Sequence, residues 1–215
     1  MWKSLTILIA VAFMLAFERV AIGLMTRCES GRRWIVRHRF MHPNSISLIR
    51  IPMGLVSILL LWLEMPSTAI LWFAFWMITD LTDGTIARCC DLTTETGKWL
   101  DPLSDKCMYF PVLLYFAIAP VPKGLPLLWV LALIVIDSVG QASRLFSAKK
   151  AANYFGKAKT ALVTILLSVL GLDIIGEVPF LGEHLLQLLT ATCTILAFFS
   201  LYCKVIPDNW YANSM

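Results

Sequence analysis

The chain has 215 residues, of which 59% are hydrophobic and only 15% are charged, and its formal net charge is +4. A composition this apolar excludes an ordinary soluble domain, and the modest charge argues against nucleic-acid binding. Together with a mean hydropathy of +0.76, it predicts an all-α, polytopic membrane protein.

The N-terminal apolar run, residues 5–17, is shorter than the ~20 residues that a membrane-spanning helix needs. The charged residues Glu18 and Arg19 follow it. Because such a pair is costly inside a bilayer, we expect an interfacial helix here, and a tilted extra span is the alternative. We therefore predict an N-terminal part over residues 1–41, composed of this helix and a basic cytoplasmic segment, and a membrane domain over residues 42–215.

The basic segment carries arginines on the cytoplasmic side of the first predicted span. These are Arg27, Arg32, Arg33, Arg37 and Arg39. Juxtamembrane arginines of this kind are typical of a surface that faces anionic lipid headgroups. The alternative, that some of them bind a substrate phosphate, is left open.

Six membrane-spanning helices are expected after residue 42. They run over about 45–63, 68–79 with a continuation into an acidic segment, 97–119, 124–146, 156–172 and 184–206. Pro43 precedes the first span, and Asn44 or Ser45 is expected to cap it. The positive-inside rule then places the arginine segment, the acidic segment and the basic loop 144–159 in the cytoplasm. A site in the acidic segment would open to the cytoplasm.

The acidic segment, residues 80–105, contains four aspartates in an otherwise apolar setting: Asp80, Asp83, Asp101 and Asp105. Helical spacing places the first two on one face of one helix, and Gly97, Asp101 and Asp105 on one stripe of the next. Four converging carboxylates repel one another unless cations lie between them. Oxygen ligands suit Mg²⁺ or Mn²⁺, so the pattern predicts a site for two divalent ions.

The full spacing is Asp80-x2-Asp83-Gly84-x2-Ala87-Arg88-x8-Gly97-x3-Asp101-x3-Asp105. It resembles the signature of the CDP-alcohol phosphotransferases, integral membrane enzymes of phospholipid synthesis. The resemblance implies that an alcohol hydroxyl attacks the β-phosphorus of CDP-diacylglycerol and displaces CMP. It also implies that the four aspartates hold the metal ions and that Asp105 accepts the hydroxyl proton.

The same resemblance implies further contacts with the CDP-lipid and a homodimer. The implied contact residues are Asn44, Thr82, Gly84, Ala87 and Arg88. Asn44 and Arg50 resemble residues near the start of the family's first span, and their alternative roles are a helix cap and an interfacial anchor. The lipid chains would lie in a groove between spans.

The segment 156–160 resembles the opening of the fifth span in phosphatidylglycerophosphate synthases, whose acceptor is glycerol 3-phosphate. Lys157 and Lys159 lie in it, and Arg144 follows Asp137 at the separation seen in that branch. These three basic residues would bind the acceptor phosphate, or else they are ordinary cytoplasmic loop charges. Ile136 stands where those synthases carry arginine, which leaves inositol, inositol phosphate and phosphatidylglycerol (cardiolipin synthesis) as alternative acceptors.

Two other protein classes also place acids in membranes. Membrane prenyltransferases separate their two acidic motifs by a long stretch of chain, which does not match residues 80–105. An ion-coupled transporter typically has two related halves with broken helices, whereas all four aspartates lie in one helix–loop–helix segment here. The transporter is the non-enzyme alternative, and metal-dependent release of CMP would exclude it.

Overall fold

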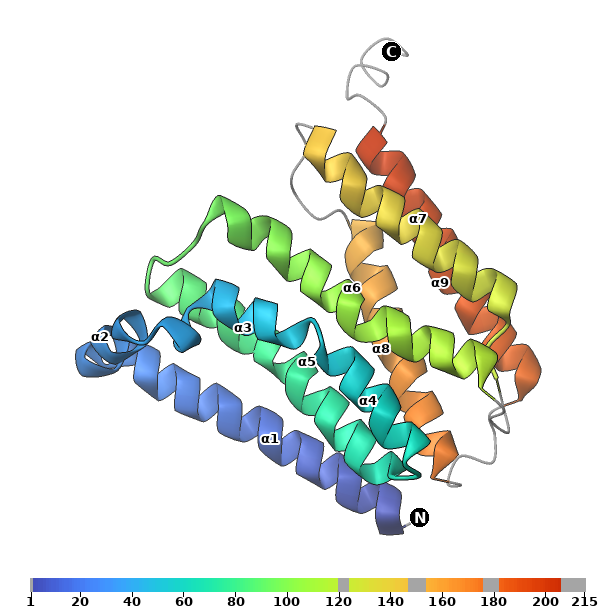
Figure 1. Ribbon diagram of the computed structural model, residues 1–215, viewed down its shortest axis with the longest axis horizontal. Helices are drawn as coiled ribbons and strands as arrows, with labels where there is room; N and C mark the ends of the chain where they lie inside the picture. Colours follow the sequence, from blue (N-terminus) through green and yellow to red (C-terminus); the bar gives the residue numbers. More distant parts are fainter. Residues whose placement is uncertain (1, 120–123, 147–153, 176–181, 206–215) are drawn as a thin grey trace. The chain divides into compact units, whose positions relative to one another are not determined.

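The computed structural model describes residues 2–119, 124–146, 154–175 and 182–205, and every regular element within these ranges is a helix (Figure 1). The expectation of an all-α chain is therefore confirmed for the described part. Residues 1–112 and 113–215 form two compact units, which are described separately. The division into residues 1–41 and 42–215 stays a prediction.

The first unit is formed by helices of very different length. They are α1 (Trp2–Arg27), α2 (Glu29–Arg37), the short 3-10 helix η1 (Arg39–Met41), α3 (Pro43–Arg50), α4 (Met53–Trp62), α5 (Pro66–Cys89) and the first part of α6 (Glu95–Ile118). Helix α5 packs against α1, α3 and α4 (Figure 1). The helix that carries the first two motif aspartates is thus held by its neighbours on more than one side.

The ends of α5 follow from local sequence. Pro66 lies in its first turn, where the missing N–H group is not needed for a helical hydrogen bond. At the other end Asp91 has a φ of 53°, and the Leu92 N–H group bonds to the Ala87 carbonyl at 3.0 Å. This is a Schellman cap. It ends the helix directly after the motif residues.

The first predicted span differs from the expectation at its start and in its middle. Helix α3 begins at Pro43, and His42 rather than Asn44 or Ser45 is its N-cap residue. The helix is then interrupted between Arg50 and Met53, because Pro52 has no N–H group and its ring disfavours a continuous helix. The break follows Arg50 directly.

The second unit contains α7 (Leu127–Phe146), α8 (Tyr154–Ile174) and α9 (Glu183–Val205). Helix α9 packs against both α7 and α8. The core of this unit is aliphatic, with Val130, Leu133, Leu166, Leu170 and Leu186 all buried. The predicted spans at 124–146, 156–172 and 184–206 are thus confirmed as helices, with ends shifted by a few residues.

Four helices in the described residues are long and apolar enough to cross a membrane. They are α1, the pair α3–α4 taken together, α8 and α9 up to Cys203. Helix α1 runs without interruption through Glu18 and Arg19, which form an ion pair with each other. The apolar run at residues 5–17 is therefore part of a helix long enough to span. The interfacial placement and the total of six spans stay predictions.

Gly54 permits a close approach between α4 and α6. A Cβ atom at this position would lie 2.5 Å from the carbonyl oxygen of Met108 and 2.7 Å from that of Cys107. We expect Gly54→Ala to lower the free energy of unfolding by about 1–3 kcal/mol, since neither backbone can give way. Thermal unfolding in detergent measures this. Gly23→Ala is the control, because nothing lies within 4 Å of its added Cβ; equal melting temperatures for both variants would contradict the close packing.

Candidate active site

The motif aspartates gather around a fully buried arginine at the end of α3. Arg50 Nη1 lies 2.8 Å from Asp80 Oδ1, and Nη2 lies 3.4 Å from carboxylate oxygens of both Asp83 and Asp105. Arg50 Nη2 also donates a hydrogen bond of 2.7 Å to Ser104 Oγ. One guanidinium group therefore joins the two acidic helices to α3. The sequence named Arg50 only as a substrate contact or an interfacial anchor.

Ser47 lies one turn before Arg50 on the same face of α3. Its hydroxyl oxygen is 3.0 Å from Asp83 Oδ2 and 2.9 Å from Asp101 Oδ1. A hydroxyl group has a single proton, so it donates to one of these carboxylates at a time. Ser47 was missed at the sequence level, where the available signal was its three-residue spacing from Arg50.

The carboxylates differ in their access to the surroundings. The Asp83 side chain is 2% exposed, whereas those of Asp105 and Asp80 are 27% and 36% exposed. The carboxyl groups of Asp80 and Asp105 both contact the guanidinium group of Arg50, through Nη1 and Nη2. Two carboxylates this close require a proton or a cation between them. Asp80 and Asp105 thus form the accessible part of the cluster.

The residues of the cluster have the donor atoms that a divalent cation needs. Four carboxylates and a hydroxyl group form the oxygen donor set that Mg²⁺ and Mn²⁺ prefer. One oxygen of Asp105 is also buried without a hydrogen bond among the described residues. Within the same residues no group of three or more His, Cys, Asp or Glu side chains is arranged closely enough to hold a metal ion. In this arrangement Arg50 supplies the positive charge.

The two motif glycines have different environments. A Cβ atom at Gly97 would lie 2.7 Å from Asn44 Oδ1 and 3.1 Å from Thr94 Oγ1. The Gly97 N–H group donates to Thr94 Oγ1 at 2.9 Å, and the Asn44 amide donates to the same oxygen at 3.0 Å. Gly97 therefore allows Thr94 to cap α6 and Asn44 to bind that cap. This contact engages Asn44, which the sequence assigned to the CDP-lipid.

Packing does not explain the glycine at position 84. An added Cβ atom would meet only the Arg88 guanidinium nitrogens, at 3.7 and 3.8 Å. Ala87 is half-buried and Arg88 is exposed. The described residues therefore leave space beside Gly84, next to an exposed cation.

Thr82, the remaining residue predicted to bind the CDP-lipid, contacts the N-terminal helix. Its hydroxyl group donates a hydrogen bond of 2.6 Å to Glu18 Oε1. No feature of the sequence indicated that Glu18 reaches the motif, because α1 was expected to be a separate interfacial element.

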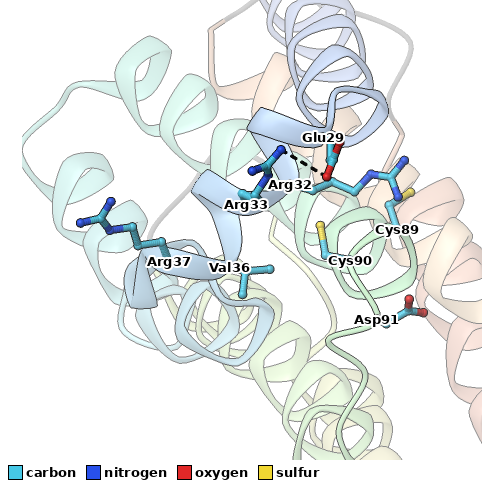
Figure 2. Close-up of a pocket in the computed structure, with 8 residues that line it drawn as sticks. All are labelled: Glu29, Arg32, Arg33, Val36, Arg37, Cys89, Cys90 and Asp91. Carbon is cyan, nitrogen blue, oxygen red and sulfur yellow. Dashed lines mark ion pairs between the residues drawn. The ribbon is translucent and has the colours of Figure 1, made fainter.

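A surface pocket of about 350 Å³ lies between α2 and the end of α5 (Figure 2). Its lining consists of Glu29, Arg32, Arg33, Val36, Arg37, Cys89, Cys90 and Asp91. Arg33 forms an exposed ion pair of 3.2 Å with Glu29. The pocket places the α2 arginines beside the end of α5 that carries the motif, so both lie on the same side of the first unit.

In the second unit Lys159 forms a buried ion pair. Its Nζ lies 2.6 Å from Asp137 Oδ2, and both side chains are at most 10% exposed. The charge of Lys159 is therefore matched by an acid on α7. The side chains of Arg144 and Lys157 lie outside the described part of the chain.

We expect Arg50→Gln to destabilise the first unit strongly, because it leaves several carboxylates without a counter-charge. The free energy of unfolding should fall by about 3–5 kcal/mol in EDTA, and Mg²⁺ should restore part of this loss by supplying positive charge. Thermal unfolding with and without Mg²⁺ measures both effects. Arg33→Gln is the control, since exposed pairs contribute at most about 1 kcal/mol. An unchanged melting temperature for Arg50→Gln would contradict its central role.

The chain is similar to known proteins over most of its length. The family model for CDP-alcohol phosphatidyltransferase matches residues 40–205. A Rickettsia bellii protein named CDP-diacylglycerol--glycerol-3-phosphate 3-phosphatidyltransferase is 30% identical over 172 residues, which cover 75% of this chain and 94% of that protein.

Proteins of the same name from Aquifex aeolicus and Rickettsia typhi are also similar. The first is 28% identical over 144 residues, covering 65% of this chain and 80% of the relative. The second is 29% identical over 172 residues, covering 75% of this chain and 96% of the relative. No solved structure matches the chain. With a family match over most of its length and the motif aspartates gathered in one cluster, the chain belongs to the CDP-alcohol phosphatidyltransferase family.

Proposed function

We propose that this enzyme transfers the phosphatidyl group of CDP-diacylglycerol to glycerol 3-phosphate and releases CMP. The observation that carries the proposal is that the four motif aspartates form one cluster, in which Arg50 contacts Asp80, Asp83 and Asp105 and Ser47 contacts Asp101. The relatives of the chain are named for this reaction. The product would be phosphatidylglycerophosphate, a precursor in phospholipid synthesis.

Two divalent ions, Mg²⁺ or Mn²⁺, would be held by Asp80, Asp83, Asp101 and Asp105. When bound, they would neutralise the pyrophosphate and stabilise the leaving CMP. Arg50 and Ser47 hold these carboxylates in one cluster through the contacts described above, and bound ions would bring the oxygens into coordinating positions. Arg50 and Ser47 would therefore position the carboxylates that hold the ions.

Asp105 is proposed as the general base. Its carboxylate is partly exposed, beside that of Asp80, and it is within reach of a ligand that enters from this side. It would accept the proton of the acceptor hydroxyl as the oxygen attacks the β-phosphorus. The pair of electrons from the broken P–O bond leaves with CMP.

The CDP-lipid is proposed to bind beside Gly84. The free space there admits a nucleotide close to the helix backbone, the small Ala87 side chain extends that surface, and the exposed Arg88 guanidinium would bind phosphate oxygens. Asn44 would contact the CDP-lipid near the start of α6. Thr82 would act indirectly, through its hydrogen bond to Glu18 of α1.

The acceptor phosphate is proposed to bind Arg144, Lys157 and Lys159. The names of the relatives favour glycerol 3-phosphate over inositol, inositol phosphate and phosphatidylglycerol. Lys159 is already paired with Asp137, so we assign it chiefly to holding α7 and α8 together.

The chain is an integral membrane protein by its apolar helices and its family. We propose that the active site faces the cytoplasm, because the arginines of α2 and the motif end of α5 lie together and such arginines favour that side. A homodimer is proposed from the family resemblance alone.

The direct test is CMP release by the purified protein with CDP-diacylglycerol and Mg²⁺ or Mn²⁺, with each candidate acceptor offered separately. The proposal predicts release with glycerol 3-phosphate alone. Release with inositol or phosphatidylglycerol instead would preserve the aspartate chemistry and replace the acceptor. Absence of CMP release with every acceptor would contradict the proposed function.

We expect Asp105→Asn to abolish turnover while Mn²⁺ and the nucleotide still bind, because a proton acceptor is lost but a ligand oxygen remains. Single-turnover CMP release and Mn²⁺ binding by the same preparation measure the two effects. Asp91→Asn is the matched control, since Asp91 lies outside the cluster in a left-handed conformation that Asn tolerates. Normal turnover by Asp105→Asn would remove its assigned role.

The two lysines of the acceptor segment should behave differently. We expect Lys157→Ala to raise the KM for glycerol 3-phosphate about tenfold with little change in the KM for CDP-diacylglycerol. Lys159→Ala should instead lower the melting temperature, because it removes the buried ion pair with Asp137. Steady-state kinetics and thermal unfolding separate these results. Equal weakening of both substrates by Lys157→Ala would argue against a phosphate contact.

A further inference from the structure

We propose that Glu18 of α1 is a positioning residue for the aspartate motif and that it acts through Thr82. The inference rests on the proposed function, because it concerns the alignment of the catalytic aspartates. Residues 1–39 precede the part of the chain that the family model matches. Helix α1 would therefore contribute to the active site from outside the matched part of the chain.

The contact is short and well enclosed. Thr82 Oγ1 donates to Glu18 Oε1 at 2.6 Å, Thr82 is 8% exposed, and the Glu18 side chain is 12% exposed. Arg19 donates to both carboxylate oxygens of Glu18, through Nε and Nη2. The pair balances its own charge and fixes the orientation of the carboxylate that accepts from Thr82.

The packing around this contact shows that it belongs to a continuous interface. Ile22 lies four residues after Glu18, and Ile86 lies four residues after Thr82. Both isoleucines are buried in one hydrophobic cluster with Ile35. Helices α1 and α5 thus meet again one helical turn further along, and they run side by side (Figure 1). The hydrogen bond therefore lies beside apolar contacts of the same interface.

Thr82 and the aspartates occupy different sides of α5. At about 100° per residue, Thr82 is about 200° from Asp80 around the helix axis. Asp80 contacts Arg50 of α3, whereas Thr82 contacts Glu18 of α1. The rotation of α5 about its axis is therefore fixed by polar contacts on two sides. Loss of the α1 contact would allow a small rotation, and misplacement by about 1 Å reduces catalysis substantially.

Kinetics of variants at the two positions test the proposal. Glu18→Ala and Thr82→Val should each lower kcat about tenfold, the size expected for one interhelical hydrogen bond in a membrane protein, with the KM for CDP-diacylglycerol nearly unchanged. The double variant should be no worse than either single variant, because both remove the same contact. Thr82→Ser and Glu18→Gln should retain most activity, since each keeps the donor or the acceptor.

Thermal unfolding of the same variants provides a second measurement that does not depend on activity. The losses in melting temperature for Glu18→Ala and Thr82→Val should also fail to add in the double variant. The controls Thr164→Val and Glu29→Gln should leave kcat unchanged, because Thr164 bonds only its own helix at an exposed position and Glu29 is 84% exposed. If Glu18→Ala fails to accumulate in membranes, the kcat values of Thr82→Val and Thr82→Ser test the proposal instead. It then requires a loss of kcat in Thr82→Val and not in Thr82→Ser.

Three results would overturn the proposal. The first is an additive loss of kcat in the double variant, and the second is full activity of Thr82→Val. The third is a raised KM for CDP-diacylglycerol at unchanged kcat for Thr82→Val, which would indicate direct contact with the nucleotide. Failure of the proposed function would look different. The unmodified protein would then release no CMP with any acceptor, while the non-additive melting temperatures would still report the contact between α1 and α5.

Discussion

The burial of like charges is the constraint on which the first unit depends. Asp83 is almost completely enclosed, and Asp80 and Asp105 are only partly exposed, in a chain that is otherwise strongly apolar. Such a cluster is stable only if it contains positive charge. Arg50 provides that charge and lies at the end of a short helix, so the position of α3 and the position of the acids are linked.

Other features of the unit follow from this link. Pro52 interrupts the helix after Arg50, so α3 ends at the residue that holds the cluster and α4 begins at Met53. Gly54 then lets α4 approach the α6 backbone, and Gly97 makes room for the cap that starts α6. In each case a small or restricted residue places a helix against the cluster. Gly84 is the exception, because no packing contact requires it, and it leaves space for a ligand.

The sequence predicted the helical class, the positions of most helices and the convergence of the acids, because apolar runs and four-residue spacing depend on local geometry. It did not predict the contacts that complete the cluster. Ser47 and Glu18 are polar residues on helices distant in sequence from the motif, and only tertiary packing brings them to Asp83 and Thr82. Sequence patterns gave no sign of the Glu18 contact, because it depends on the packing of α1 against α5.

The four motif aspartates are proposed to form one site for two divalent ions. Mn²⁺ titration followed by electron paramagnetic resonance, in the presence of CDP-diacylglycerol, tests it most directly. The account predicts two bound Mn²⁺ ions per chain with magnetic coupling between them, and loss of that coupling in Asp83→Asn but not in Asp91→Asn. Uncoupled binding, or binding that Asp83→Asn leaves unchanged, would contradict it.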